Sequence, residues 1–223
     1  MAPSKKQLID LSHTIEAGMI TYEGLPAPII CDYLSREEST KHYAEGVSFQ
    51  IGKIEMVANT GTYVDVPFHR YAEGDDLAQV TLEKLVNLEG ILFQTEDRAI
   101  TPELFVGTNL QGKAVLIQTG WDRYWRAEEY FSGNHPYVTA DAATFLRDAK
   151  ATLVGIDSYN IDNTSDWERP AHSILLGAGI PIVEHMTNLS ALPQRGFRFT
   201  AAPPKIVGMG SFPVRAFATL GEK

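Results

Sequence analysis

The chain has 223 residues, of which 44% are hydrophobic and 21% charged, and this globular composition excludes disordered, collagen-like and coiled-coil proteins. Acidic residues outnumber basic ones by 28 to 19, giving a formal net charge of −9. Such a surface should repel phosphate backbones, so nucleic acid is not expected as a partner. The single cysteine, Cys31, excludes an internal disulfide and any Cys-based zinc site.

Membrane and export signals are not evident. The opening segment lacks the apolar stretch of a secretion signal, and no apolar run approaches the roughly 20 residues of a membrane span. We therefore expect a cytoplasmic protein without membrane contact. No repeat or linker divides the chain, so residues 1–223 are predicted to form one domain.

Strand signals flank a central region of alternating elements. Residues 8–69 are strand-rich, and the last 30 residues return to strands. Between them, short apolar runs bounded by Gly, Pro and Asp are typical of buried strands. These runs lie at 91–93, 114–119, 152–156, 180–183 and 206–207. The order predicts an α/β fold with a mixed β-sheet.

Helix signals fall between the strand signals. Thr139 can cap a helix over 139–150, with Asp141 in its first turn. Pro170 suits the start of a helix that Gly177 can end. Shorter helices are predicted after Thr81 and after Thr101.

The densest polar cluster is NTGTYVDVPFH, residues 59–69. In an extended strand Asn59 and Tyr63 would lie about 13 Å apart, too far to share one small ligand. On a helical turn they would lie about 6 Å apart, but Asp65 would then point elsewhere. Convergence of these residues with His69 therefore requires an irregular segment, where active sites concentrate. The alternative is a surface turn with a capping aspartate.

Three later polar residues stand at positions that suggest function. His172 faces the apolar side of its predicted helix, where a structural histidine is the alternative. Glu184 ends a buried strand and shares the orientation of Ile180 and Ile182, so it needs a partner, a metal or a surface position. Asp157 ends another strand at the edge where α/β proteins bind ligands, with a structural aspartate in a turn as the alternative.

Residues 59–69 resemble the signature H-x-G-T-H-x-D-x-P-x-H of the cyclase-like metal-dependent hydrolases, a family that includes bacterial kynurenine formamidase and isatin hydrolase. Further segments match in the same order along the chain. They are LIDLSHTIEAGMITYEG, VLIQTGWDRYW, LVGIDSYNID, PAHSILLGAGIPIVE and PPKIVGMGSFPVRAFA. The resemblance covers nearly the whole chain.

The resemblance implies an α/β fold of the swivelling β/β/α type with a mixed β-sheet, assembled as a homodimer or homotetramer. It also implies hydrolysis of small amides or cyclic amides by metal-activated water. Carried over by position, Asp65 matches a metal ligand and His69 the acid/base histidine. His172 and Glu184 match the later metal ligands, and Tyr22 matches an aromatic substrate contact.

Two positions depart from the signature. Asn59 and Tyr63 stand where the family has metal-binding histidines. An amide is a weak ligand compared with imidazole, and a phenol must lose a proton with a reference pKa near ~10 before it binds well. The ordinary ligands that remain are Asp65, His172 and Glu184. We therefore expect no cofactor, with a manganese or zinc ion held by these three residues as the alternative.

The favoured hypothesis is metal-independent acid/base chemistry by a lyase, cyclase or hydrolase. His69 would act as the base, oriented by Asp65 or Glu184. Tyr63 and Asn59 would donate hydrogen bonds to a developing oxyanion. The alternatives are a Mn- or Zn-dependent amidohydrolase, in which the ion activates water and His69 moves the proton, and a non-catalytic small-molecule binder.

A small-molecule substrate is the expected partner. Aromatic residues at the presumed pocket suggest a flat or aromatic compound, with core packing as the alternative role. These residues are Tyr22, Tyr63, Phe68, Trp121 and Trp167.

Overall fold

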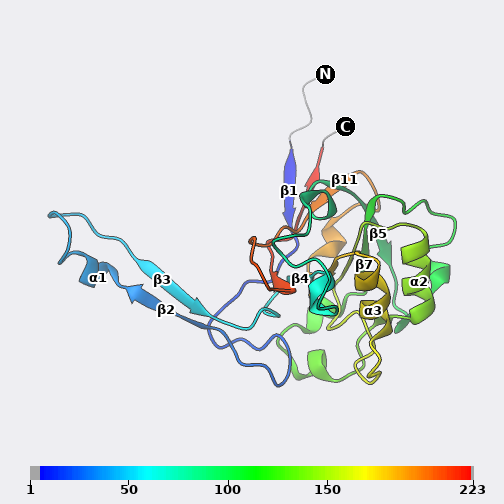
Figure 1. Ribbon diagram of the computed structural model, residues 1–223, viewed down its shortest axis with the longest axis horizontal. Coiled ribbons are helices and arrows are strands. Elements are labelled where there is room, and N and C mark those ends of the chain that lie inside the picture. Colours follow the sequence, from blue (N-terminus) through cyan, green and yellow to red (C-terminus); the bar gives the residue numbers. More distant parts are fainter. Residues whose placement is uncertain (1–5, 222–223) are drawn as a thin grey trace.

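A nine-stranded β-sheet organises the computed structural model, which describes residues 6–221 (Figure 1). Its spatial order is β1 (Gln7–Asp10), β13 (Phe217–Leu220), β11 (Phe197–Thr200), β5 (Leu88–Gln94), β7 (Lys113–Gln118), β9 (Leu153–Ile156), β10 (Ile182–Glu184), β4 (Tyr63–Asp65) and β12 (Ser211–Pro213). The four neighbours from β5 to β10 pair in parallel, and the flanking pairs are antiparallel. The predicted α/β class and mixed sheet are confirmed, while the swivelling β/β/α type stays a prediction.

The remaining elements lie around this sheet. Two small sheets pair β2 (Ile29–Leu34) with β3 (Ile51–Glu55), and β6 (Ala99–Ile100) with β8 (Tyr137–Val138). The α-helices are α1 (Arg36–Ser39), α2 (Ala140–Asp148) and α3 (Pro170–Gly177). The 3₁₀ helices are η1 (Pro67–His69), η2 (Leu82–Lys84), η3 (Pro102–Leu104), η4 (Trp121–Tyr124), η5 (Glu128–Phe131) and η6 (Leu189–Ala191). Among residues 6–221, no helix is long and apolar enough to cross a membrane.

Side-chain alternation along β7 divides the core into two layers. Ala114 and Leu116 belong to one buried cluster, and Val115 and Ile117 belong to the other. Successive residues of a strand point to opposite faces, so a continuous apolar run is buried on both sides. Residues of α2 and α3 pack in the second cluster, and Figure 1 shows these two helices side by side against the sheet.

Most of the predicted elements are present. The apolar runs at 91–93, 114–119, 152–156 and 180–183 coincide with β5, β7, β9 and β10. Thr139 caps α2 by accepting a 3.2 Å hydrogen bond from the Ala142 amide. The predicted strand at 206–207 is wrong, because Val207 is 83% exposed and leads into a turn at Gly208, where φ is +74°.

Candidate active site

The cluster at 59–69 forms a short strand followed by a tight helical turn. Tyr63 and Asp65 point to the same face of β4 because they are two residues apart. Pro67 then starts η1, which turns the chain and brings His69 back, so that His69 Nδ1 lies 3.7 Å from Asp65 Oδ1. Convergence thus arises from one strand and one 3₁₀ turn. Asn59 lines the same pocket from the irregular segment before β4.

Ser211 joins Asp65 to His69. The β12–β4 register places Ser211 opposite Asp65, and its hydroxyl donates a short hydrogen bond to Asp65 Oδ1. The same hydroxyl lies 2.8 Å from His69 Nδ1. Gly210 permits this approach, because a Cβ there would lie 2.3 Å from the His69 amide nitrogen.

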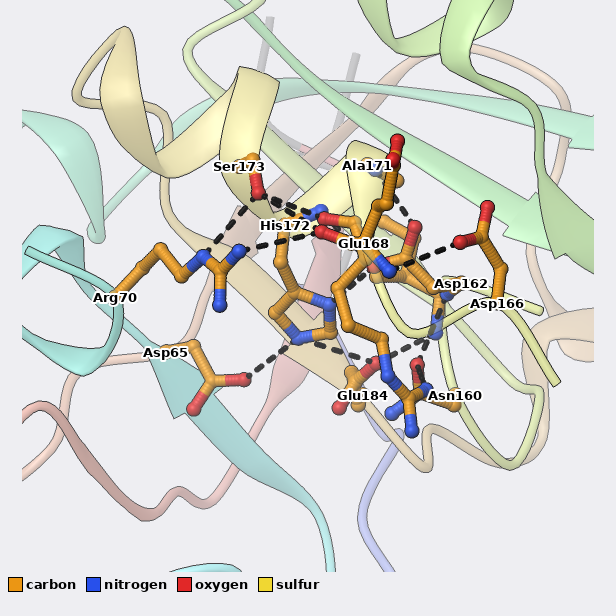
Figure 2. Close-up of polar contacts among 12 residues, drawn as sticks. Asp65, Arg70, Asn160, Asp162, Asp166, Glu168, Ala171, His172, Ser173 and Glu184 are labelled. Atoms are coloured by element: carbon orange, nitrogen blue, oxygen red, sulfur yellow. Dashed lines mark hydrogen bonds and ion pairs between the residues drawn. The ribbon is translucent and has the colours of Figure 1, made fainter. Parts of the chain in front are cut away.

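His172 is oriented from the start of α3 by Asp162. The buried Asp162 carboxylate accepts hydrogen bonds from the amides of Ala171 at 2.6 Å and His172 at 3.1 Å. It also lies 2.6 Å from His172 Nδ1, which leaves Nε2 facing Asp65 Oδ2 at 3.5 Å and Glu184 Oε1 at 3.8 Å. Figure 2 shows the imidazole between the Asp65 and Glu184 carboxylates. His172 is therefore placed in this polar cluster and not only in the apolar core.

Glu184 is buried and has partners for both oxygens. Tyr63, opposite it in the β10–β4 register, donates a 2.7 Å hydrogen bond to Oε2. The Ile161 amide donates to Oε1 at 2.6 Å. Burial raises the pKa of Tyr63 well above its ordinary value, as do the charges of Glu184 and Asp65. The phenol therefore keeps its proton.

Negative charge is in excess around His172. Burial alone would lower the pKa of His172, but Glu184, Asp162 and Asp65 raise it to about 10. Burial, with the nearby Asp65 charge, raises the pKa of Glu184 to about 7. Burial would also raise the pKa of Asp65, but contacts with His172, His69 and Ser211 hold it below its ordinary value. Three buried carboxylates thus surround one imidazole.

These side chains fit a divalent cation. Asp65 Oδ2 is buried and has no hydrogen-bond partner among the described residues, so it has an acceptor to offer. Ligand atoms of Asp65, His69 and His172 lie within 4.8 Å of one another. Carboxylate and imidazole are the usual zinc and manganese ligands outside Cys sites. Glu184 faces the same His172 nitrogen and would supply a second negative charge.

A cavity of about 340 Å³ opens over these groups. It is lined by Tyr22, Leu25, Asn59, Tyr63, His69, Arg70, Asn160, Arg169, His172 and Glu184. Tyr22 lines this cavity and stacks on Tyr159 with ring centroids 4.7 Å apart, while its role as a substrate contact stays a prediction.

The other predicted aromatic contacts and Asp157 lie elsewhere. Phe68 is outside the lining of this cavity, and Trp121 lines a different one beside Arg98 and Arg123. Trp167 is 93% exposed. Asp157 accepts hydrogen bonds from Thr119 and Gly120, so it organises the turn after β7.

Sequence reasoning missed several residues of this site. Asp162 and Ser211 orient the histidines, and Arg70 and Arg169 line the mouth. Both Asp162 and Ser211 stand in segments that match the family, LVGIDSYNID and GMGSFPV. No local spacing singles them out.

Comparison with known proteins identifies the family. Residues 9–163 match the family model Cyclase, described as "Putative cyclase". The chain belongs to the Cyclase family. The resemblance noted from residues 59–69 is thereby confirmed.

Cyclase-family relatives align over most of this chain. The kynurenine formamidase of Bacillus cereus (strain ATCC 14579) is 28% identical over 210 residues, which cover 93% of this chain and 95% of the relative. That of Geobacillus thermodenitrificans is 29% identical, with coverages of 78% and 81%.

Solved structures share the fold. Isatin hydrolase A from Labrenzia aggregata superposes with a TM-score of 0.81 at 22% identity, covering 97% of this chain and 94% of that one. A protein described as a potential metal-dependent hydrolase with cyclase activity gives a TM-score of 0.80 at 27% identity, covering 98% and 100%. Together with the Asp65–His69–His172 group, these relatives favour the metal-dependent alternative over the metal-independent chemistry expected from Asn59 and Tyr63.

Proposed function

We propose that this Cyclase-family protein is a metal-dependent hydrolase that cleaves the C–N bond of a small aromatic or cyclic amide. The observation that carries the proposal is the buried excess of carboxylates around His172, together with Asp65 Oδ2, which forms no hydrogen bond among the described residues and faces His172 Nε2. Buried charge of one sign is costly unless a counter-charge is present. The formamidase and hydrolase names of the relatives supply the reaction class.

We assign metal binding to Asp65, His172 and Glu184. His172 presents Nε2 between the two carboxylates, and both carboxylates are completely buried. His69 is left out because its side chain is 36% exposed and its Nδ1 contacts Ser211. A zinc or manganese ion bound there would supply Lewis acidity, which activates water and polarises a carbonyl.

His69 is assigned the proton transfer. The Ser211 hydroxyl has one proton and donates it to the Asp65 carboxylate, so its oxygen accepts from His69 Nδ1–H. That tautomer leaves Nε2 of the neutral ring unprotonated. His69 Nε2 can then take a proton from the attacking water and return it to the departing amide nitrogen.

Tyr63 is a positioning residue in this mechanism. Its phenol stays protonated and donates a hydrogen bond to Glu184, which holds that carboxylate in one orientation. The sequence predicted that Tyr63 and Asn59 stabilise an oxyanion. For the Asn59 amide, which lines the cavity, this role stays a prediction.

Metal-independent acid/base catalysis is the second candidate function. It is favoured by one observation, the replacement of two signature histidines by Asn59 and by a phenol that keeps its proton. In that case His69 would be the base without a metal partner.

Metal content and activity of the same sample separate the two candidates. Protein purified without added metal is analysed for elements, and hydrolysis of formanilide and of isatin is followed before and after dialysis against a chelator. We expect one equivalent of zinc or manganese, with activity lost on chelation and restored by that ion. Undiminished hydrolysis by metal-free protein would select the second candidate, and ligand binding without turnover would indicate a non-catalytic binder.

A further inference from the structure

Two arginines stand at the mouth of the cavity, one beside each site histidine. Arg70 follows His69 at the end of η1, and Arg169 precedes α3, three residues before His172. Within residues 6–221, neither guanidinium forms an ion pair with a carboxylate. Both charges are therefore available to a ligand.

Neutral acceptors hold the two guanidinium groups in place. Arg70 donates to the Ser173 hydroxyl and to the Glu168 carbonyl oxygen, each at 3.2 Å, as Figure 2 shows. Arg169 donates to Asn160 Oδ1 at 3.3 Å. Such contacts fix the orientation of a guanidinium without neutralising it, which preserves its capacity for bidentate binding of a carboxylate.

The position of Arg169 is also connected to the chemistry. Its backbone adopts a left-handed conformation, with φ of +51° and ψ of +58°. This conformation is unfavourable for a residue with a Cβ and is retained where the surroundings require it. Asn160 accepts from both Arg169 and the amide of Asp162, which orients His172. Arg169 is thus part of the hydrogen-bond network of the site.

Charge is arranged by depth in this cavity. The Glu184 carboxylate that lines the cavity is buried, as is the Asp65 carboxylate, which shares the His172 Nε2 atom with it. Of the two arginines that line the cavity, Arg70 is exposed and Arg169 is half-buried, in a protein with net charge −9. Tyr22 and Leu25 add apolar walls. We propose that the substrate is an aromatic amide that also carries a carboxylate, bound by Arg70 and Arg169 while the amide reaches the base. This inference rests on the proposed function for the bond that is cleaved.

Matched substrates test the assignment. Hydrolysis of 3-carboxyformanilide is compared with that of its uncharged methyl ester, in wild type, Arg70→Met, Arg169→Met and the double variant. We expect kcat/KM to favour the carboxylate at least about tenfold in wild type, and the preference to disappear in the double variant. Arg123→Met is the control, because Arg123 lines the other cavity and stacks on Tyr124, so the preference should persist.

A binding measurement keeps the two proposals separable. Calorimetry compares 3-aminobenzoate with 3-aminobenzamide, which requires no turnover. Hydrolysis of both amides without preference would overturn this inference and leave the hydrolase intact. Hydrolysis of neither amide, with tighter binding of the benzoate that the arginine variants lose, would overturn the proposed reaction and retain the carboxylate site.

Discussion

Tyr63 and Glu184 lie opposite each other in the β4–β10 ladder, and the phenol donates a 2.7 Å hydrogen bond to the carboxylate. Both side chains are buried. Burial raises the pKa of Glu184 to about 7 and moves that of Tyr63 well above 10, so the proton stays on the phenol at neutral pH. Tyr63, which replaces a signature histidine, therefore orients the Glu184 side chain by donating a hydrogen bond to it.

Removing that proton donor should weaken the fold. Tyr63→Phe preserves shape but leaves Glu184 Oε2 without its partner, which should lower the free energy of unfolding of metal-free protein by about 1–3 kcal/mol. Urea denaturation measures this change. Tyr71→Phe is the matched control, because that exposed phenol donates to the Ser173 carbonyl oxygen and its loss should cost less. Equal stability of Tyr63→Phe and wild type would mean that the hydrogen bond contributes nothing.

Metal content should separate ligands from the proton carrier. We expect Asp65→Asn, His172→Gln and Glu184→Gln to lose the ion together with activity. His69→Gln should retain the ion while kcat falls about 10²- to 10⁴-fold, the usual contribution of a general base. Elemental analysis and steady-state kinetics give both quantities. His42→Gln, at an exposed histidine between β2 and β3, is the control. Loss of metal from His69→Gln would instead make His69 a metal ligand as well, as the Asp65–His69–His172 grouping permits.

The sequence indicated which residues belong to the candidate site, but not how they come together in space. Asp65, His69, His172 and Glu184 were identifiable because the signature and two later segments match a family in order. Their convergence was less accessible, since it depends on Pro67 starting a 3₁₀ turn directly after β4. Alternation of residue types along a strand indicates which side chains share one face of the sheet. It does not predict a 3₁₀ turn directly after the strand.

Some residues of the candidate site could not be predicted because their partners lie far away in the sequence. Ser211 reaches Asp65 through a strand pairing that spans 146 residues, and this register has no local signal. Trp121 was expected at the presumed pocket as one of several aromatic residues, but it follows β7 and lines another cavity. The rule that ligands bind at the carboxyl ends of strands, which was applied to Asp157, identifies one edge of the sheet. It does not identify a particular pocket along that edge.

Ser211 should control the tautomer of His69. Ser211→Ala removes the hydroxyl that accepts from His69 Nδ1 and donates to Asp65, so His69 can present the wrong nitrogen to the pocket. We expect kcat to fall about 10- to 100-fold, with metal retained and the pH profile of kcat displaced. Ser211→Thr, which keeps the hydroxyl, should recover part of the activity. An unchanged pH profile in Ser211→Ala would show that the hydroxyl does not act through His69.

Metal affinity should fall as the pH falls. A metal ligand must be a neutral imidazole, yet the surrounding carboxylates raise the pKa of His172 to about 10 against the effect of burial. Each ion bound below that pH therefore displaces a proton, and the association constant should rise about tenfold per pH unit between 7 and 9. The slope should steepen below pH 7, where Glu184 also becomes protonated.

The same shift predicts how metal-free protein responds to pH. The folded pKa of His172 lies above its ordinary value of 6.5, so the stability that its charge contributes is complete below pH 6.5 and is lost as the pH rises towards 10. The difference in Tm between metal-loaded and metal-free protein should thus widen from pH 6 to pH 9. Competition titrations with a chromophoric chelator and thermal unfolding measure the two trends. An affinity independent of pH would mean that His172 is already neutral in the metal-free protein, and the carboxylates around it would then not hold its proton.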